Sequence, residues 1–188
     1  MMIEQILNTY YADYENKPFI SSDRDFDTWF KEVSVSKSKL VPKRNMQFTK
    51  ENLLAGDIIL LWRINFGTFT TESIKTGYYP KYFEYSYGID APSNLKKLLE
   101  DGYVLINTLL NSLEHNKMDN LKVALKSKNI KGISKLNKKE LHSLIKNNFS
   151  EEELEQFISV RLYSLTDKGI LALKNNQEIV DRHPKKKF

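Results

Sequence analysis

Cysteine is absent from the sequence, which excludes disulfide bonds and thiolate metal sites. Long apolar runs are absent too: the longest, "DIILLWRI" at residues 57–64, begins with a carboxylate and falls far short of the ~18 residues that span a membrane. The opening stretch "MMIEQILNTYY" lacks the basic region and following apolar region of a signal peptide. These absences predict a cytoplasmic protein with no membrane partner.

Signatures of catalytic sites are equally sparse. The three histidines, His115, His142 and His183, are scattered, and none has a second ligand nearby at the spacing of a metal site. The chain has only seven glycines and contains neither a glycine-rich phosphate loop nor a nucleophile elbow. We therefore expect no enzymatic activity, no cofactor and no metal, although a nuclease with dispersed carboxylates would show none of these signatures.

Positive charge is concentrated in one segment. Residues 117–147 hold nine lysines and two acids, a net charge of +7, whereas the whole chain carries +5, so the remainder sums to −2. Such asymmetry is the electrostatic footprint of a surface that meets phosphate. The competing interpretation is a solvated lysine face that keeps the protein soluble. Lysine outnumbers arginine 24 to 5 over the chain, a bias typical of an AT-rich bacterial or phage genome.

The apolar residues of this segment follow a helical period. They fall on one face of each of two short helices, separated by a link around Gly132. Asn137 is placed to cap the second helix, with Glu140 at its third position as in a capping box. The residues of the two apolar faces are Leu121, Ala124 and Leu125, then Leu141, Leu144 and Ile145.

The stretch "IKGISKLNKKELHSLI", residues 130–145, resembles the helix-extension-helix family, which includes SAP domains, LEM domains and the N-terminal domain of transcription terminator Rho. It is close to the Rho-type order of apolar residue, Gly, apolar residue, Ser, Lys and Leu, followed by Lys-Lys-Glu-Leu. "LKVALKSKNI", residues 121–130, supplies the preceding helix. The glycine of the SAP-type Ser-Gly-x-Lys motif is missing, which favours the Rho-like branch. SAP domains bind DNA, whereas LEM domains mainly bind protein.

The resemblance and the charge together imply a nucleic-acid-binding surface, with DNA favoured. Lysines at the link and at the start of the second helix would form its phosphate-facing edge, and the helix N-terminus would add partial positive charge. The predicted nucleic-acid-binding residues are Lys122, Lys126, Lys128, Lys131, Ser134, Lys135, Asn137, Lys138 and Lys139.

The flanking sequence suggests a second motif. "SNLKKLLEDGYVLIN", residues 93–107, reads as a helix that ends at Gly102 and is followed by a strand. "RLYSLTDKGILAL", residues 161–173, is similar to the return strand of winged helix-turn-helix regulators. We expect residues 103–107 and 161–166 to pair as the two strands of a wing. The alternative is that "LTDKG" is only a strand-to-helix turn.

The N-terminal part contains two amphipathic stretches. "IEQILNTYYADY" precedes "DRDFDTWFKEV", for which Ser22 or Asp23 is the expected N-cap. The predicted fold class is α+β and mainly helical, with a helix-extension-helix unit inserted between two strands of a winged-helix-like body. The expected divisions are an N-terminal helical segment at 1–48, the winged-helix-like domain at 49–116 and 155–188, and the inserted unit at 117–150.

Two functions fit these expectations. The first is a nucleic-acid-binding accessory or regulatory protein of bacterial or phage origin. The second is a protein-binding adaptor or inhibitor from a mobile element, acting on a host nucleic-acid enzyme. Salt-dependent contacts between lysine and phosphate would provide most of the affinity in the first case. The sequence leaves the oligomeric state open.

Overall fold

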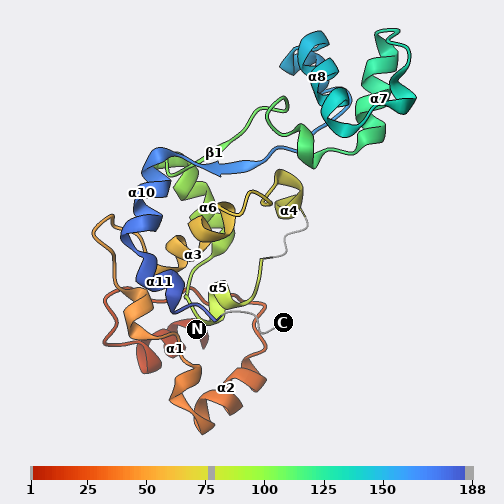
Figure 1. Ribbon diagram of the computed structural model, residues 1–188. Helices are drawn as coiled ribbons and strands as arrows, with labels where there is room; N and C mark the ends of the chain where they lie inside the picture. The colour runs from red at the N-terminus through yellow and green to blue at the C-terminus, as the bar shows by residue number, and fades with distance from the viewer. Residues whose placement is uncertain (1, 76–78, 185–188) are drawn as a thin grey trace. The chain divides into compact units, whose positions relative to one another are not determined.

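The computed structural model describes residues 2–75 and 79–184 and confirms a mainly helical α+β protein with one small sheet (Figure 1). No helix in these two ranges is long and apolar enough to cross a membrane. The chain divides into two compact units. Unit 1 comprises residues 2–63, 79–104 and 165–184, and unit 2 comprises residues 64–75 and 105–164.

Unit 1 is built from helices, and its N-terminal part packs around an apolar cluster that includes Ile6, Trp29 and Val33. Its α-helices are α1 (Met2–Tyr10), α2 (Phe26–Val35), α3 (Ala55–Ile64), α5 (Tyr82–Tyr85), α6 (Ala91–Glu100), α10 (Asp167–Asn175) and α11 (Gln177–Asp181), with 3₁₀ turns η1 (Lys37–Lys39) and η2 (Lys43–Met46). The last residue of α3 already belongs to unit 2.

The middle of helix α3 is apolar on every side, which suits a position surrounded by protein. Residues 58–61 have no exposed surface, as expected for a helix buried on all sides. Asp57 near its start is buried as well, and its carboxylate accepts hydrogen bonds from Asn94 Nδ2 at 2.6 Å and from the Leu54 backbone N–H at 2.8 Å. Burial raises the pKa of Asp57, and these two hydrogen bonds oppose the rise.

Helix α2 begins two residues later than the sequence suggested. Its N-cap is Asp25, whose carboxylate accepts from the Thr28 backbone N–H at 3.0 Å, so the expected cap at Ser22 or Asp23 was wrong. Those two residues lie in a preceding turn closed by the hydrogen bond from Arg24 N to Ser21 O. Any of several nearby oxygens could cap this helix, and the turn determines which one does.

The segment "LTDKG" connects β2 (Tyr163–Leu165) to α10 in unit 1. Thr166 caps the helix by accepting from the Gly169 N–H at 3.2 Å, and its hydroxyl donates to the Gly102 carbonyl at 2.6 Å. Lys168 donates to the Asp101 carbonyl at 2.7 Å. The motif therefore ties the start of α10 to the end of α6 and forms a strand-to-helix turn with Thr166 as the N-cap.

Position 169 requires glycine because the backbone of Tyr103 passes close to it. A Cβ atom there would lie 2.1 Å from the Tyr103 carbonyl oxygen, a backbone atom that cannot rotate away. We expect Gly169→Ala to lower the free energy of unfolding by about 1–3 kcal/mol. In an unconstrained helix the same substitution stabilises by about 1 kcal/mol, so the sign itself is diagnostic.

Chemical denaturation of the two variants Gly169→Ala and Lys174→Ala would measure this effect. Lys174 is exposed on the same helix, and its substitution should change stability by no more than about 0.5 kcal/mol. A Gly169→Ala protein as stable as the wild type would show that α10 does not depend on this close approach.

His183 lies in an aromatic cage near the end of the described chain. The Tyr87 hydroxyl is 2.7 Å from His183 Nδ1, and the rings of Tyr82 and Trp62 have centroids 4.9 and 5.2 Å from the imidazole. Burial, and then the charge of Arg63, lower the pKa of His183 below its ordinary value of 6.5. Burial also raises the pKa of Tyr87 to about 12. The cage therefore favours neutral side chains.

The depressed pKa predicts a loss of stability on acidification. The unfolded chain takes up the His183 proton at higher pH than the folded chain, so stability falls as the pH drops through about 6.5. We expect unfolding free energies measured from about pH 7.5 to about pH 5.5 to fall more steeply for the wild type than for His183→Gln. Parallel curves for the two proteins would contradict a cage that excludes the charged imidazole.

The sheet consists of β1 (Val104–Ile106) and β2, and the boundary between the two units falls within each of these strands. The strands are antiparallel: Thr166 N donates to Tyr103 O at 3.1 Å, and Asn107 N donates to Leu162 O at 2.8 Å. The predicted pairing of residues 103–107 with 161–166 is thus confirmed. Residues 69–71 pair with the other edge of residues 161–163, through bonds such as Tyr163 N to Phe69 O.

Unit 2 contains α4 (Thr71–Lys75), 3₁₀ turn η3 (Leu113–His115), α7 (Met118–Ser127), 3₁₀ turn η4 (Ile133–Lys135), α8 (Lys138–Asn148) and α9 (Glu151–Leu154). Helices α7 and α8 lie side by side (Figure 1). The prediction that residues 117–148 form two helices, interrupted near Gly132, is confirmed.

Candidate nucleic-acid interface

The link between α7 and α8 has a defined backbone. Asn129 adopts a left-handed conformation (φ 57°), and the bonds from Asn129 N to Lys126 O and from Ile130 N to Leu125 O close a Schellman motif at the end of α7. Gly132 is also left-handed, at φ 77°. Two left-handed residues within four positions redirect the chain, so α8 can return alongside α7.

Capping fixes the start of α8. Asn137 Oδ1 accepts from the Glu140 N–H at 3.1 Å, and Glu140 Oε2 accepts from the Asn137 N–H at 2.8 Å. The predicted capping box is therefore confirmed. It also places the Glu140 carboxylate at the helix N-terminus and commits the Asn137 side-chain oxygen, so Asn137 has only its Nδ2 group left to offer a phosphate.

A buried cluster holds the helix pair in place. It combines the two predicted apolar faces with residues before α7 and after α8, so the pair shares one core with its flanking segments. Burying each large aliphatic side chain contributes about 1.5–3 kcal/mol. The buried members are Leu109, Leu113, Leu121, Ala124, Leu125, Ile133, Leu141, Ile145, Phe149, Leu154 and Ile158.

Most of the predicted contact lysines have solvated ammonium groups. Within the described part of the chain, no carboxylate lies within 4.0 Å of the ammonium groups of Lys122, Lys126, Lys131, Lys135 or Lys139. All but the partly buried Lys122 are exposed, as is Ser134 in the link. These lysines are available to anions without breaking an ion pair.

Two predicted contact lysines are already engaged. Lys138 Nζ lies 2.7 Å from Glu114 Oε1 and also donates to the Glu114 carbonyl at 2.9 Å. Lys128 Nζ lies 2.7 Å from Glu153 Oε1 and 4.4 Å from the centre of the Phe149 ring. Neither partner could be inferred from spacing along the chain, because both acids lie more than twenty positions from their lysines.

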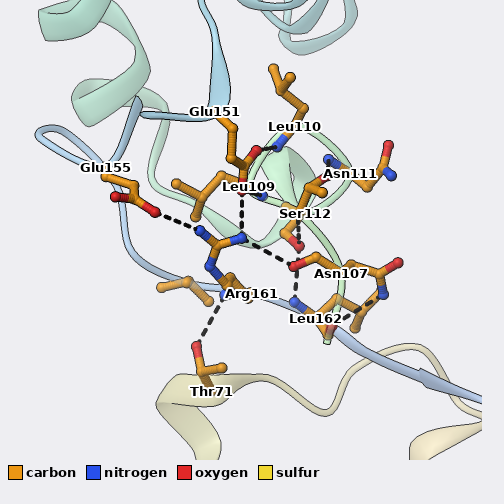
Figure 2. Close-up of polar contacts among 12 residues, drawn as sticks. Thr71, Asn107, Leu109, Leu110, Asn111, Ser112, Glu151, Glu155, Arg161 and Leu162 are labelled. Atoms are coloured by element: carbon orange, nitrogen blue, oxygen red, sulfur yellow. Dashed lines mark hydrogen bonds and ion pairs between the residues drawn. The ribbon is translucent and has the colours of Figure 1, made fainter. Parts of the chain in front are cut away.

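A group of polar contacts in unit 2, which we call the polar brace, is centred on Arg161 (Figure 2). Its guanidinium pairs with Glu151 and, at 3.0 Å, with Glu155. The Glu151 carboxylate also accepts from the backbone N–H groups of Leu109 at 2.6 Å and Leu110 at 3.2 Å. The Glu151 carboxylate on α9 thus connects the residue just before β2, Arg161, with the segment that follows β1.

Hydrogen bonds to Glu151 outweigh its burial. Partial burial raises its pKa, but the two backbone donors and Arg161 more than compensate, and the pKa of Glu151 stays below its ordinary value. The carboxylate therefore remains ionised at neutral pH. Sequence reasoning missed this brace, because its three parts come from separate segments and no spacing rule links them.

Neighbouring loops are held by amide and hydroxyl groups. Ser112 Oγ donates to the Thr108 carbonyl at 2.7 Å and accepts from the Leu162 N–H at 2.9 Å. Asn116 Nδ2 donates to the Val160 carbonyl at 2.9 Å. Both Ser112 and Asn116 are buried, so these bonds pair side-chain polar groups that would otherwise be buried without a partner.

The brace predicts a local stability effect. Glu151→Gln removes the charge and leaves Arg161 and two backbone donors incompletely paired, so we expect unfolding free energy to fall by about 1–3 kcal/mol. Glu155→Gln removes only the exposed arm of the same brace and should cost no more than about 1 kcal/mol. Urea titrations that rank the two substitutions in the opposite order would contradict this account.

Comparison with known proteins finds no match to this chain among family models, curated proteins or solved structures. Among the described residues, no group of three His, Asp or Glu side chains is arranged to hold a metal ion. The case for a function therefore rests on the charge and geometry of unit 2 itself.

Proposed function

We propose that the protein is a nucleic-acid-binding accessory or regulatory protein that contacts phosphate through α7, η4 and α8. The observation that carries this proposal is the concentration of a +7 charge on residues 117–147, with its lysines outside a buried apolar cluster. A helix pair stabilised from within and charged outside matches a polyanion better than an apolar partner.

The shape of the helix pair supports the same proposal. Two short helices joined by an extended link with a 3₁₀ turn are the arrangement expected of a helix-extension-helix unit. We further propose that the paired strands β1 and β2 are the wing of a winged-helix-like body into which this unit is inserted. DNA is the ligand that we propose, because SAP domains, which share the helix-extension-helix arrangement although not every residue of the motif here, bind DNA.

Lysine substitution tests the proposal. Replacing Lys131, Lys135, Lys138 and Lys139 with alanine should preserve folding, because none of them belongs to the buried cluster. Each lysine that meets phosphate contributes about 0.9 to the slope of log affinity against log salt on duplex DNA. Because Lys138 is already paired with Glu114, the loss of the other three lysines should flatten this slope by about 3. Fluorescence anisotropy with duplex and single-stranded DNA at several salt concentrations measures both affinity and slope.

A matched control removes the same charge elsewhere. Lys31, Lys37, Lys50 and Lys174 are exposed residues of unit 1, and their fourfold alanine variant has the same net charge as the test variant. It should retain most of the affinity and the salt slope. Equal losses in both variants would reduce the effect to total charge, and unchanged binding by the first variant would overturn the assignment of this surface.

A protein-binding adaptor or inhibitor is the second candidate, and one observation favours it. Ile170 and Leu171 on α10 expose 51% and 58% of their surface. Exposed neighbouring aliphatic side chains are a feature of protein contacts. If the DNA titrations show no binding at low salt, the two residues can be substituted with serine. Wild-type protein that captures the host nucleic-acid enzyme, and a serine variant that does not, would then support this second function.

A further inference from the structure

Two carboxylates occupy lysines at opposite ends of the link between α7 and α8. Lys128 is the C-cap residue of α7, and Lys138 is the first residue of α8, so they bracket the link that carries Lys131 and Lys135. Each bracket lysine is held by an acid from outside the helix pair, Glu153 on α9 or Glu114 on η3.

These contacts are close and specific. Glu114 holds Lys138 by both its carboxylate and its backbone carbonyl, at 2.7 and 2.9 Å. Its other carboxylate oxygen lies 3.7 Å from His142 Nδ1. The Lys138 ammonium lowers the pKa of Glu114, and the Lys128 ammonium lowers that of Glu153. Both acids are therefore ionised at neutral pH.

Their energetic cost to a ligand is small. The glutamates keep 67% and 47% of their side-chain surface exposed, and exposed ion pairs contribute little to stability. A phosphate that approaches the link can displace them, but it must compete with them. The pairs are therefore poorly explained as supports of the fold and well placed to set the affinity of the surface.

We infer that Glu114 and Glu153 are built-in competitors of nucleic-acid phosphate for Lys138 and Lys128. This inference rests on the proposed function of the same surface. With both acids in place, the phosphate-contacting set is Lys122, Lys126, Lys131, Lys135 and Lys139. Without its carboxylate partner, each lysine at an end of the link is held only by a neutral carbonyl, that of Glu114 for Lys138 and that of Asn148 for Lys128, with which a phosphate can compete. Affinity is thereby limited below what the lysine content alone would give.

Single charge-neutralising substitutions test this inference in the full chain. Glu114→Gln and Glu153→Gln should each tighten binding of a short fluorescein-labelled DNA duplex roughly two- to fivefold. Each should also steepen the salt slope by about 0.9. Glutamine is close in size to glutamate and can still accept from the Ser150 N–H, as Glu153 does at 2.8 Å, so the cap of α9 is kept.

The controls make the same change of charge next to each site. Glu152 adjoins Glu153 on α9, and Asp119 lies in the first turn of α7; both are exposed, and within the described chain neither has a lysine or arginine within 4.0 Å. Glu152→Gln and Asp119→Asn should therefore tighten binding less than the test variants and leave the slope unchanged. Thermal unfolding followed by circular dichroism confirms that all four variants fold.

A double substitution separates release of one lysine from a general change of potential. In a Lys138→Ala background, Glu114→Gln should no longer improve binding, and Glu153→Gln should behave likewise with Lys128→Ala. Gains that persist without the partner lysine would overturn the inference.

The outcomes also separate this inference from the proposed function. If the wild type binds and the test variants bind no better than their controls, the competition is absent while the function stands. If the wild type binds weakly and the Glu114→Gln, Glu153→Gln double variant binds well, both are supported. If neither protein binds DNA at low salt, both are overturned.

Discussion

The buried contact between α7 and α8 is the constraint on which the candidate surface depends. Leu121, Leu125, Leu141 and Ile145 are fully buried between the helices and their flanking segments. Lysine ammonium groups repel one another, so helices this rich in lysine would separate without an apolar core. The core converts a charged sequence into a charged surface of fixed shape.

The charge that the candidate surface presents depends on its surroundings as much as on its own residues. The flanking segments provide the acids that hold Lys128 and Lys138, and they also complete the apolar cluster. The Arg161 brace in turn holds α9 and the segment after β1, which together provide both acids and several of the apolar residues. The stability of unit 2 and the charge of the candidate surface therefore depend on the same short segments.

Local patterns in the sequence were sufficient wherever the determining contacts are close along the chain. The capping box of Asn137 and Glu140, the Gly102 helix end and the two apolar faces all depend on residues within four positions of one another, and each prediction is confirmed. The pairing of β1 with β2 was also predicted, because the return-strand motif has a recognisable form. The interpretation of these strands as a wing, and of the lysines as phosphate contacts, stays a prediction.

Tertiary structure alone decided the features that join distant segments. In the sequence, Gly169 is the last residue of the "LTDKG" motif. Only the close approach of the Tyr103 carbonyl explains why no side chain fits at this position. Asp25 became the cap of α2 because a turn places it there, although nearby oxygens had equal propensity. The sequence by itself determined how many lysines unit 2 carries and on which side of its helices they lie. Folding determined which of them meet a carboxylate, because an ion pair depends on distance in space and the acids are remote in the chain.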